Sequence, residues 1–103
     1  MMGDRRSPRT VETGPALHRH QLRVRTVAIS FAAAVRSMQR HPDVGPTERD
    51  ALIQRWRAWS LDALDEYTRA ATPLIRGAAD GDSKERAALE DELERAYRMV
   101  REA

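Results

Sequence analysis

Three stretches of the chain repeat apolar residues every three or four positions, and this period constrains the fold more than any other feature. The first stretch, residues 17–40, carries Val24, Ala28, Phe31, Val35 and Met38 at these spacings. Such spacing places the residues on one side of an α-helix. Because no stretch shows the alternating pattern of a half-buried strand, the sequence predicts an all-α protein.

Turn-forming sequences separate the three periodic stretches. HPDVGP at residues 41–46 and DGDS at residues 80–83 concentrate proline, glycine and aspartate, which mark connections. The apolar face of the second stretch comprises Leu52, Trp56, Trp59, Ala63, Tyr67, Ala70 and Leu74. That of the third comprises Leu89, Leu93, Ala96 and Val100. Since short connections make successive helices antiparallel neighbours, we expect an antiparallel three-helix bundle.

Pro73 falls within the second helical stretch and interrupts its hydrogen bonding, because proline has no backbone N–H. Either the helix kinks there, or Thr72 caps a short new helix. Leu74 and Ala78 continue the apolar face that precedes the proline. This continuity favours one long second helix, kinked near Pro73 and ending at about Ala79.

The first sixteen residues differ in composition from the rest of the chain. They are rich in Gly, Pro, Ser, Thr and Arg, and Val11 is their only strong core former beyond the two initial methionines. A stretch with so little apolar surface cannot offset the entropy that it loses on ordering. We therefore expect a flexible basic arm at residues 1–16 and a helical bundle domain at residues 17–103.

The sequence RWRAW at residues 55–59 contains both tryptophans of the chain. Trp56 and Trp59 lie about 60° apart on a helix, inside the apolar face, whereas Arg55 and Arg57 lie at its edges. Arginines at such edges lay their methylenes along the core. We interpret both indoles as core anchors rather than as a ligand cage or a nucleic-acid platform. The predicted core is Val24, Phe31, Val35, Met38, Leu52, Trp56, Trp59, Tyr67, Leu74, Leu89, Leu93 and Val100.

The charge distribution and the lack of cysteine narrow the classes of protein. Residues 1–41 carry eight arginines against Asp4 and Glu12, although the net charge of the whole chain is only +2. The absence of cysteine excludes disulfides and thiolate metal sites, and it fits a reducing compartment. No apolar run reaches the roughly 18 residues that a membrane span requires. We expect a cytoplasmic protein with no membrane partner.

A second apolar strip on the first helix gives the leading hypothesis for function. Leu22, Ile29 and Ala33 lie opposite the core side of this helix and share its back face with Arg25 and Arg36. A helix that is apolar on two sides is generally central to a bundle or part of a subunit interface. We expect a small non-catalytic interaction or regulatory module that forms a homo-oligomer or docks a protein partner through this face.

Nucleic-acid binding is the second hypothesis. The basic side chains that are suited to contact phosphates are Arg5, Arg6 and Arg9 on the arm, with Arg19 and Arg23 on the first helix. The sequence shows no helix-turn-helix spacing, no zinc-finger signature and no exposed aromatic for stacking on bases. Any such binding would therefore be directed at the phosphate backbone.

The third hypothesis is a small-ligand or catalytic pocket near Arg49, Trp56 and Ser60, at one end of the bundle. The five glycines of the chain form no phosphate-binding loop. His18 and His20 point in different directions on a helix, so they cannot chelate one metal ion together. We therefore assign no catalytic residue, no cofactor and no metal site from the sequence.

Overall fold

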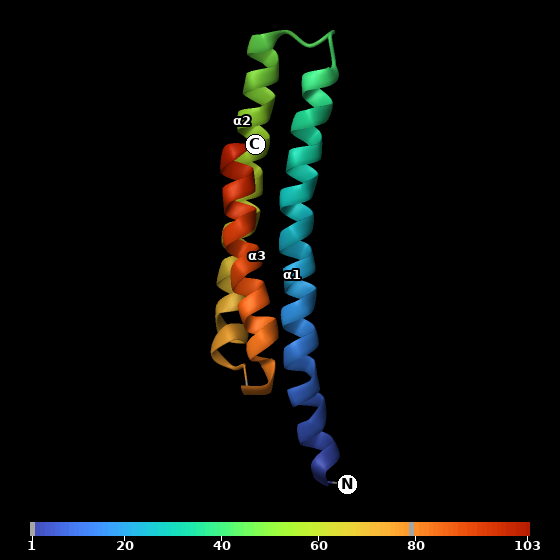
Figure 1. The fold of residues 1–103 in the computed structure, drawn as a ribbon, viewed down its shortest axis with the longest axis vertical. Coiled ribbons are helices and arrows are strands. Elements are labelled where there is room, and N and C mark those ends of the chain that lie inside the picture. Colours follow the sequence, from blue (N-terminus) through green and yellow to red (C-terminus); the bar gives the residue numbers. More distant parts are fainter. Residues whose placement is uncertain (1, 79) are drawn as a thin grey trace.

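The computed structural model describes the backbone of residues 2–78 and 80–103, and the side chains of residues 14–78 and 81–103. Three helices follow one another: α1 (Met2–Arg40), α2 (Pro46–Arg76) and α3 (Ser83–Glu102), with a short 3-10 turn, η1 (Asp80–Asp82), before α3. The described residues form no strand. Successive helices run in opposite directions (Figure 1), and α1 packs against both others. The predicted all-α antiparallel three-helix bundle is confirmed.

The first helix begins at Met2, ahead of the start at Leu17 that the sequence predicts. Leu17 is fully buried, and one turn earlier Gly14 lies so close to Asp82 that a Cβ atom would come within 3.1 Å of the Asp82 carboxylate. Residues 14–16, which the sequence analysis assigned to the arm, are thus helical and lie beside η1. The side chains of residues 1–13 are outside the described residues, and the flexibility of the arm stays a prediction.

The core follows the axis of the bundle and takes one side of each helix. α1 contributes Leu17, Val24, Ala28, Phe31 and Val35, and α3 contributes Leu89, Leu93, Ala96 and Val100. The apolar period of both helices therefore identified their buried sides correctly. Met38, at the end of the predicted face of α1, is only partly buried because α3 does not reach it.

The second helix is rotated relative to the prediction. Its fully buried residues are Leu64 and Ala71, which were not in the predicted core, whereas Trp56 and Tyr67 are only partly buried. Trp59 is 63% exposed, so its assignment to the core is wrong. The apolar surface of α2 is broader than one neighbouring helix can cover. The neighbours of Leu64 on this helix, Asp65 and Thr68, contact Tyr97 of α3. Trp59 instead lines a groove on the side away from α3.

Pro73 lies inside α2, which continues to Arg76. One continuous helix, rather than a second helix beginning at Thr72, was the prediction from the sequence, and it is confirmed. Gly77 caps the end of α2, and its N–H donates to the carbonyl oxygen of Pro73 at 3.0 Å. The helix is thus three residues shorter than the predicted end at about Ala79.

Arg57 joins all three helices near the end of α3. Its Nε donates to the carbonyl oxygen of Val100 at 3.0 Å, and its Nη2 donates to that of Ala103 at 2.7 Å. The guanidinium carbon also lies 5.7 Å from the centre of the Phe31 ring. A cation at this place satisfies carbonyls that have no partner within the helix. Beyond this junction α1 and α2 continue as a two-helix hairpin (Figure 1).

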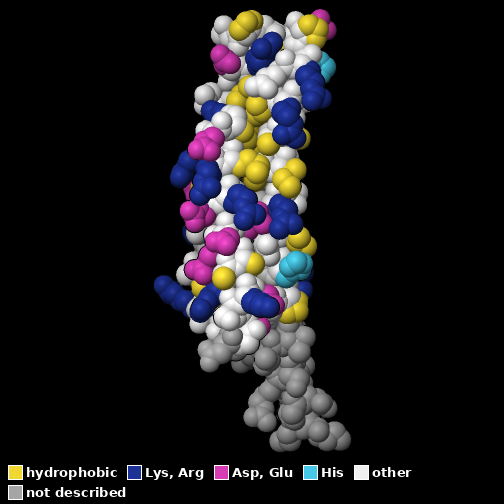
Figure 2. Space-filling view, in the orientation of Figure 1, with side chains coloured by type: hydrophobic (Ala, Val, Ile, Leu, Met, Phe, Trp, Pro, Cys, Tyr) yellow, Lys and Arg dark blue, Asp and Glu magenta, His cyan; other side chains and the backbone are white. Residues whose placement is uncertain are grey.

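The molecule is elongated, with extents of 64 × 19 × 18 Å. On the face shown in Figure 2, hydrophobic side chains follow a seam in the upper half, and acidic side chains lie mainly over α2 and α3. Within the described residues, no helix has a segment long and apolar enough to cross a membrane.

The rotation of α2 is tested by two substitutions that remove comparable aliphatic side chains. Leu64→Ala should lower the free energy of unfolding by about 2–5 kcal/mol, because it leaves a cavity in the core. Ile29→Ala, at a residue that is 50% exposed, should change it by less than about 1 kcal/mol. Urea unfolding followed by circular dichroism, at one protein concentration, measures both. Equal losses would contradict the observed orientation of the helices.

Candidate docking groove

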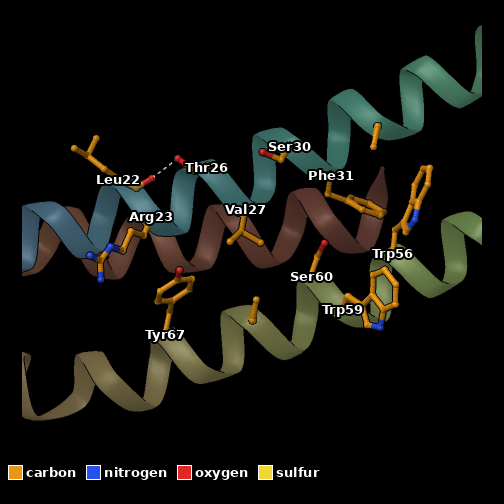
Figure 3. A pocket seen from close by; sticks show the side chains of 12 residues that line it. Leu22, Arg23, Thr26, Val27, Ser30, Phe31, Trp56, Trp59, Ser60 and Tyr67 are labelled. Atoms are coloured by element: carbon orange, nitrogen blue, oxygen red, sulfur yellow. Dashed lines mark hydrogen bonds between the residues drawn. The ribbon is translucent and has the colours of Figure 1, made fainter.

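A groove runs between α1 and α2 on the side away from α3, which passes behind them (Figure 3). Its volume is ≈ 610 Å³. The lining residues are Leu22, Arg23, Thr26, Val27, Ser30, Phe31 and Ala34 from α1, and Trp56, Trp59, Ser60, Ala63 and Tyr67 from α2. Arg23 is the one charged residue among these twelve. The groove is therefore a mainly apolar surface.

The groove stays open because of the small side chains along α1. Thr26, Ser30 and Ala34 are spaced four residues apart, so they form a line on one side of the helix. Each is too short to reach across to α2. The Thr26 hydroxyl turns back instead and donates to the carbonyl oxygen of Leu22 at 2.8 Å. This line of small residues leaves space for side chains from outside the bundle.

Polar contacts between the two helices fix one end of the groove. His20 is 8% exposed, and its Nε2 donates to the carbonyl oxygen of Tyr67 at 2.8 Å. The two rings meet edge to face, with 5.3 Å between their centres. In Figure 3 the Tyr67 hydroxyl points toward α1 near Arg23. This end is thus more polar than the rest and has a fixed spacing between α1 and α2.

The two tryptophans form the other end of the groove (Figure 3). Trp56 packs against the buried core, whereas Trp59 leaves most of its ring in solvent. Among the described side chains the exposed large hydrophobics are Leu22, Ile29 and Trp59, and two of these three line the groove. Exposed apolar surface gathered in a concave site marks an interaction surface or a ligand groove.

The predicted partner-binding residues of α1 divide into three groups. Leu22 is 42% exposed and lines the groove. Ile29, Ala33 and Arg36 are exposed but lie outside the lining. Arg25 contacts α3 instead. The second apolar strip of α1, which comprises Leu22, Ile29 and Ala33, is thus exposed and not covered by the described chain. Of these three residues, only Leu22 lines the groove.

Arg25 holds a buried carboxylate within the bundle. Glu92 is only 4% exposed, and its Oε1 accepts hydrogen bonds from Arg25 Nε at 3.2 Å and Nη2 at 3.0 Å. Gln21 Nε2 donates to the same oxygen at 3.3 Å. A buried carboxylate is costly unless it is paired in this way. Sequence reasoning missed Glu92, although its place three residues after Leu89 puts it on the apolar face of α3.

The basic residues of the nucleic-acid hypothesis are only partly described. Arg19 and Arg23 are exposed on α1, four residues apart, and Arg23 lines the groove. The side chains of Arg5, Arg6 and Arg9 lie outside the described residues. Binding of phosphates by these arginines stays a prediction.

The three residues of the predicted ligand pocket do not all meet. Trp56 and Ser60 line the groove, but Arg49 is not among its lining residues. Arg49 Nη2 donates to the carbonyl oxygen of Val44, five residues earlier, at 3.2 Å. Its role is therefore at the connection before α2. The sequence could place Trp56 and Ser60 on one side of a helix, but not Arg49, whose direction depends on the loop.

A polar cluster lies between α2 and α3, away from the groove. The Tyr97 hydroxyl donates to Asp65 at 2.5 Å and lies 3.1 Å from the Thr68 hydroxyl. The Arg101 guanidinium carbon is 5.2 Å from the centre of the Tyr97 ring. Partial burial, together with the hydrogen bond to Asp65, raises the pKa of Tyr97 above its ordinary value of 10.0. Each polar group of the cluster has a partner, so the cluster serves to join the two helices.

The described part of the chain offers no cluster suited to a metal ion, and the groove has few groups that could transfer a proton. No group of three His, Asp or Glu side chains there is placed to hold a metal ion. The groove is lined by neither a carboxylate nor an imidazole. What the groove offers is apolar surface and a few hydroxyl groups.

Removing the partner of Glu92 should destabilise the bundle. Arg25→Ala should lower the free energy of unfolding by about 1–3 kcal/mol, because the buried carboxylate loses its charged donor. Arg36→Ala, at an exposed arginine of the same helix, serves as the control with little effect. Adding Glu92→Leu to Arg25→Ala should recover part of the loss. A double variant no more stable than Arg25→Ala would argue against this account; chemical denaturation measures all three.

Neutralising Asp65 should lower the pKa of Tyr97 toward its ordinary value, because the hydroxyl then ionises without a carboxylate beside it. Since the folded-state pKa is raised, the stability linked to Tyr97 is present below the unfolded pKa and is lost as the pH rises through the folded value. Tyrosinate absorbance against pH, in a Tyr67→Phe background, compares Asp65→Asn with the control Asp62→Asn. An unchanged pKa in Asp65→Asn would show that the hydrogen bond contributes nothing.

The groove is thus an open, mainly apolar site with a polar end and an aromatic end. A scan against known protein families and searches of curated proteins and of solved structures find no match for this chain.

Proposed function

We propose that this chain is a non-catalytic interaction module, and that its docking surface is the groove between α1 and α2. The observation that carries the proposal is the exposure of Leu22 and Trp59 along an open apolar groove of ≈ 610 Å³. Aromatic side chains at such sites are frequent anchors of protein interfaces. The absence of cysteine fits a reducing compartment, so a cytoplasmic location is part of this proposal.

The shape of the groove favours a helix as its occupant. The lining of α1 extends from Leu22 to Ala34, which corresponds to about 18 Å along the helix axis. The small residues Thr26, Ser30 and Ala34 follow this length in one line. A partner helix packs onto such a line by placing its larger side chains between the small ones. A compact small molecule would occupy only part of it.

The chemistry of the lining argues against catalysis at this site. General acid–base catalysis needs a titratable side chain within hydrogen-bond reach of the reacting group. The lining offers the hydroxyls of Thr26, Ser30, Ser60 and Tyr67, with Arg23 as its one charge. The Thr26 hydroxyl is already directed to a backbone carbonyl. The groove is therefore better suited to bury apolar side chains than to move protons.

Photo-cross-linking in the cells that make the protein tests this proposal. The photoreactive residue p-benzoylphenylalanine replaces Trp59 in the groove or, as the matched control, Glu90 on the exposed face of α3. A docked protein lies within reach of residue 59, so irradiation should give a covalent protein adduct at this position and much less at residue 90. Mass spectrometry identifies the attached chain. Equal or absent adducts at both positions would contradict the proposal.

A further inference from the structure

We propose that the occupant of the groove is a second copy of this chain, related to the first by a two-fold axis parallel to the helices. This inference rests on the proposed function and names its partner. In the resulting dimer, α1 of each copy lies on α2 of the other, and the four helices form one bundle with antiparallel neighbours. The charge and the shape of the two rims of the groove favour this arrangement.

The first step is the charge of the α1 rim. From Gly14 to Arg40 the sequence contains five arginines and no acidic residue. All five are exposed, and two of them lie on the groove side of α1: Arg19 comes three residues before Leu22, and Arg23 three residues before Thr26. The α1 rim is therefore basic.

The α2 rim carries the opposite charge at the same end of the groove. Asp62 and Glu66 are exposed and follow Trp59 by three and seven residues, so they lie on the same side of α2 as this indole. Their positions place them beside Ala63, which lines the groove. One rim is thus basic and the other acidic, and this is the pattern that lets two copies of one surface attract each other.

The second step is the alignment of the two helices. The contacts His20–Tyr67 and Phe31–Arg57 show which residues of α1 and α2 lie at the same height in the bundle. Because the two helices are antiparallel, Glu66, one residue before Tyr67, lies level with Gln21, one residue after His20. Rotation about an axis parallel to the helices preserves height. Glu66 of one copy then faces the stretch between Arg19 and Arg23 of the other, so each dimer gains two such charge contacts.

The third step is the fit of Trp59 to the same surface. Two residues beyond Arg57, Trp59 lies level with Ile29. The rotation brings it onto α1 of the other copy, where Thr26 and Ser30 of the groove lining present small side chains close to this height. The protruding indole on the α2 rim and the small side chains on the α1 rim therefore lie at the same height along the groove. Burying the ring that is 63% exposed would supply the apolar contact of the dimer.

The other two-fold arrangement is disfavoured by charge. An axis perpendicular to the helices would place α1 on α1 and α2 on α2. The basic rim, with Arg19, Arg23 and no acidic residue, would then face a copy of itself. Like charges at an interface are destabilising. The parallel axis avoids this repulsion and is the arrangement that we infer.

Sedimentation equilibrium of the purified chain tests the dimer. We expect a mass that rises with concentration to twice that of the chain, and a dissociation constant that increases with salt. Trp59→Ala and Glu66→Arg should each raise the dissociation constant about tenfold or more, a change of about 1.4 kcal/mol. Glu90→Arg, the matched charge reversal on α3, should leave it unchanged. Circular dichroism confirms that each variant is folded.

The pairing of the helices is tested with single cysteines, since the chain contains none of its own. Chains carrying Thr26→Cys are mixed with chains carrying Ala63→Cys and oxidised. Because α1 faces α2 across the proposed interface, the mixed disulfide should dominate. A Thr26→Cys disulfide with itself would instead show α1 on α1 and overturn the parallel axis.

The outcomes separate this inference from the proposed function. A purified chain that remains monomeric up to its solubility limit, or a dimer that is insensitive to both Trp59→Ala and Glu66→Arg, would overturn the second copy as the occupant. If the photoreactive residue at position 59 then attached a different protein in cells, the proposed function would still stand. If it attached nothing, both would fall.

Discussion

The buried carboxylate of Glu92 is the constraint on which much of the architecture depends. A carboxylate that is 4% exposed must receive hydrogen bonds from charged or polar donors, and Arg25 and Gln21 of α1 supply them. Because these donors lie on one side of α1, α3 is held on that side. Arg57 anchors the other end of α3 through the carbonyl oxygen of Val100. Together these contacts fix the position of α3 along and around the two longer helices.

The position of α3 determines which apolar surface remains open. A helix that packs on one side of a pair leaves the opposite side uncovered, and here the uncovered side carries Trp59, Leu22 and a line of small residues. The α1–α2 pair has apolar surface on two sides, and α3 covers only one of them. The groove is thus the place where a fourth helix could pack. Docking of another helix, from a second copy or a different protein, would complete the packing that the chain leaves unfinished.

The charge distribution of the chain contributes both to the packing of α3 and to the character of the groove. α1 carries arginine without acidic residues from Gly14 to Arg40, whereas α2 and α3 carry the acids. Within one chain this asymmetry lets α3 pair with α1 through Glu92 and Arg25. On the groove side, α3 does not cover Arg23 of α1 or Glu66 of α2, and both are exposed. Their opposite charges would therefore favour one orientation of a partner that docks there. One asymmetry therefore contributes to folding and to the proposed recognition.

The sequence by itself determined the helices, their antiparallel order and the buried sides of α1 and α3. On each of these two helices the apolar period of three to four residues marks one continuous stripe, and the second apolar strip of α1 shares its face with arginines. It also identified Leu22 and Ile29 as residues without a partner. It did not determine the rotation of α2, whose apolar residues cover a wide arc: the spacing placed Trp59 in the predicted core and left Leu64 out, whereas Leu64 is buried and Trp59 is exposed. Only the tertiary structure decided between them. α3 covers the Leu64 flank, and the burial of a side chain on a broad apolar helix depends on where its neighbours stand.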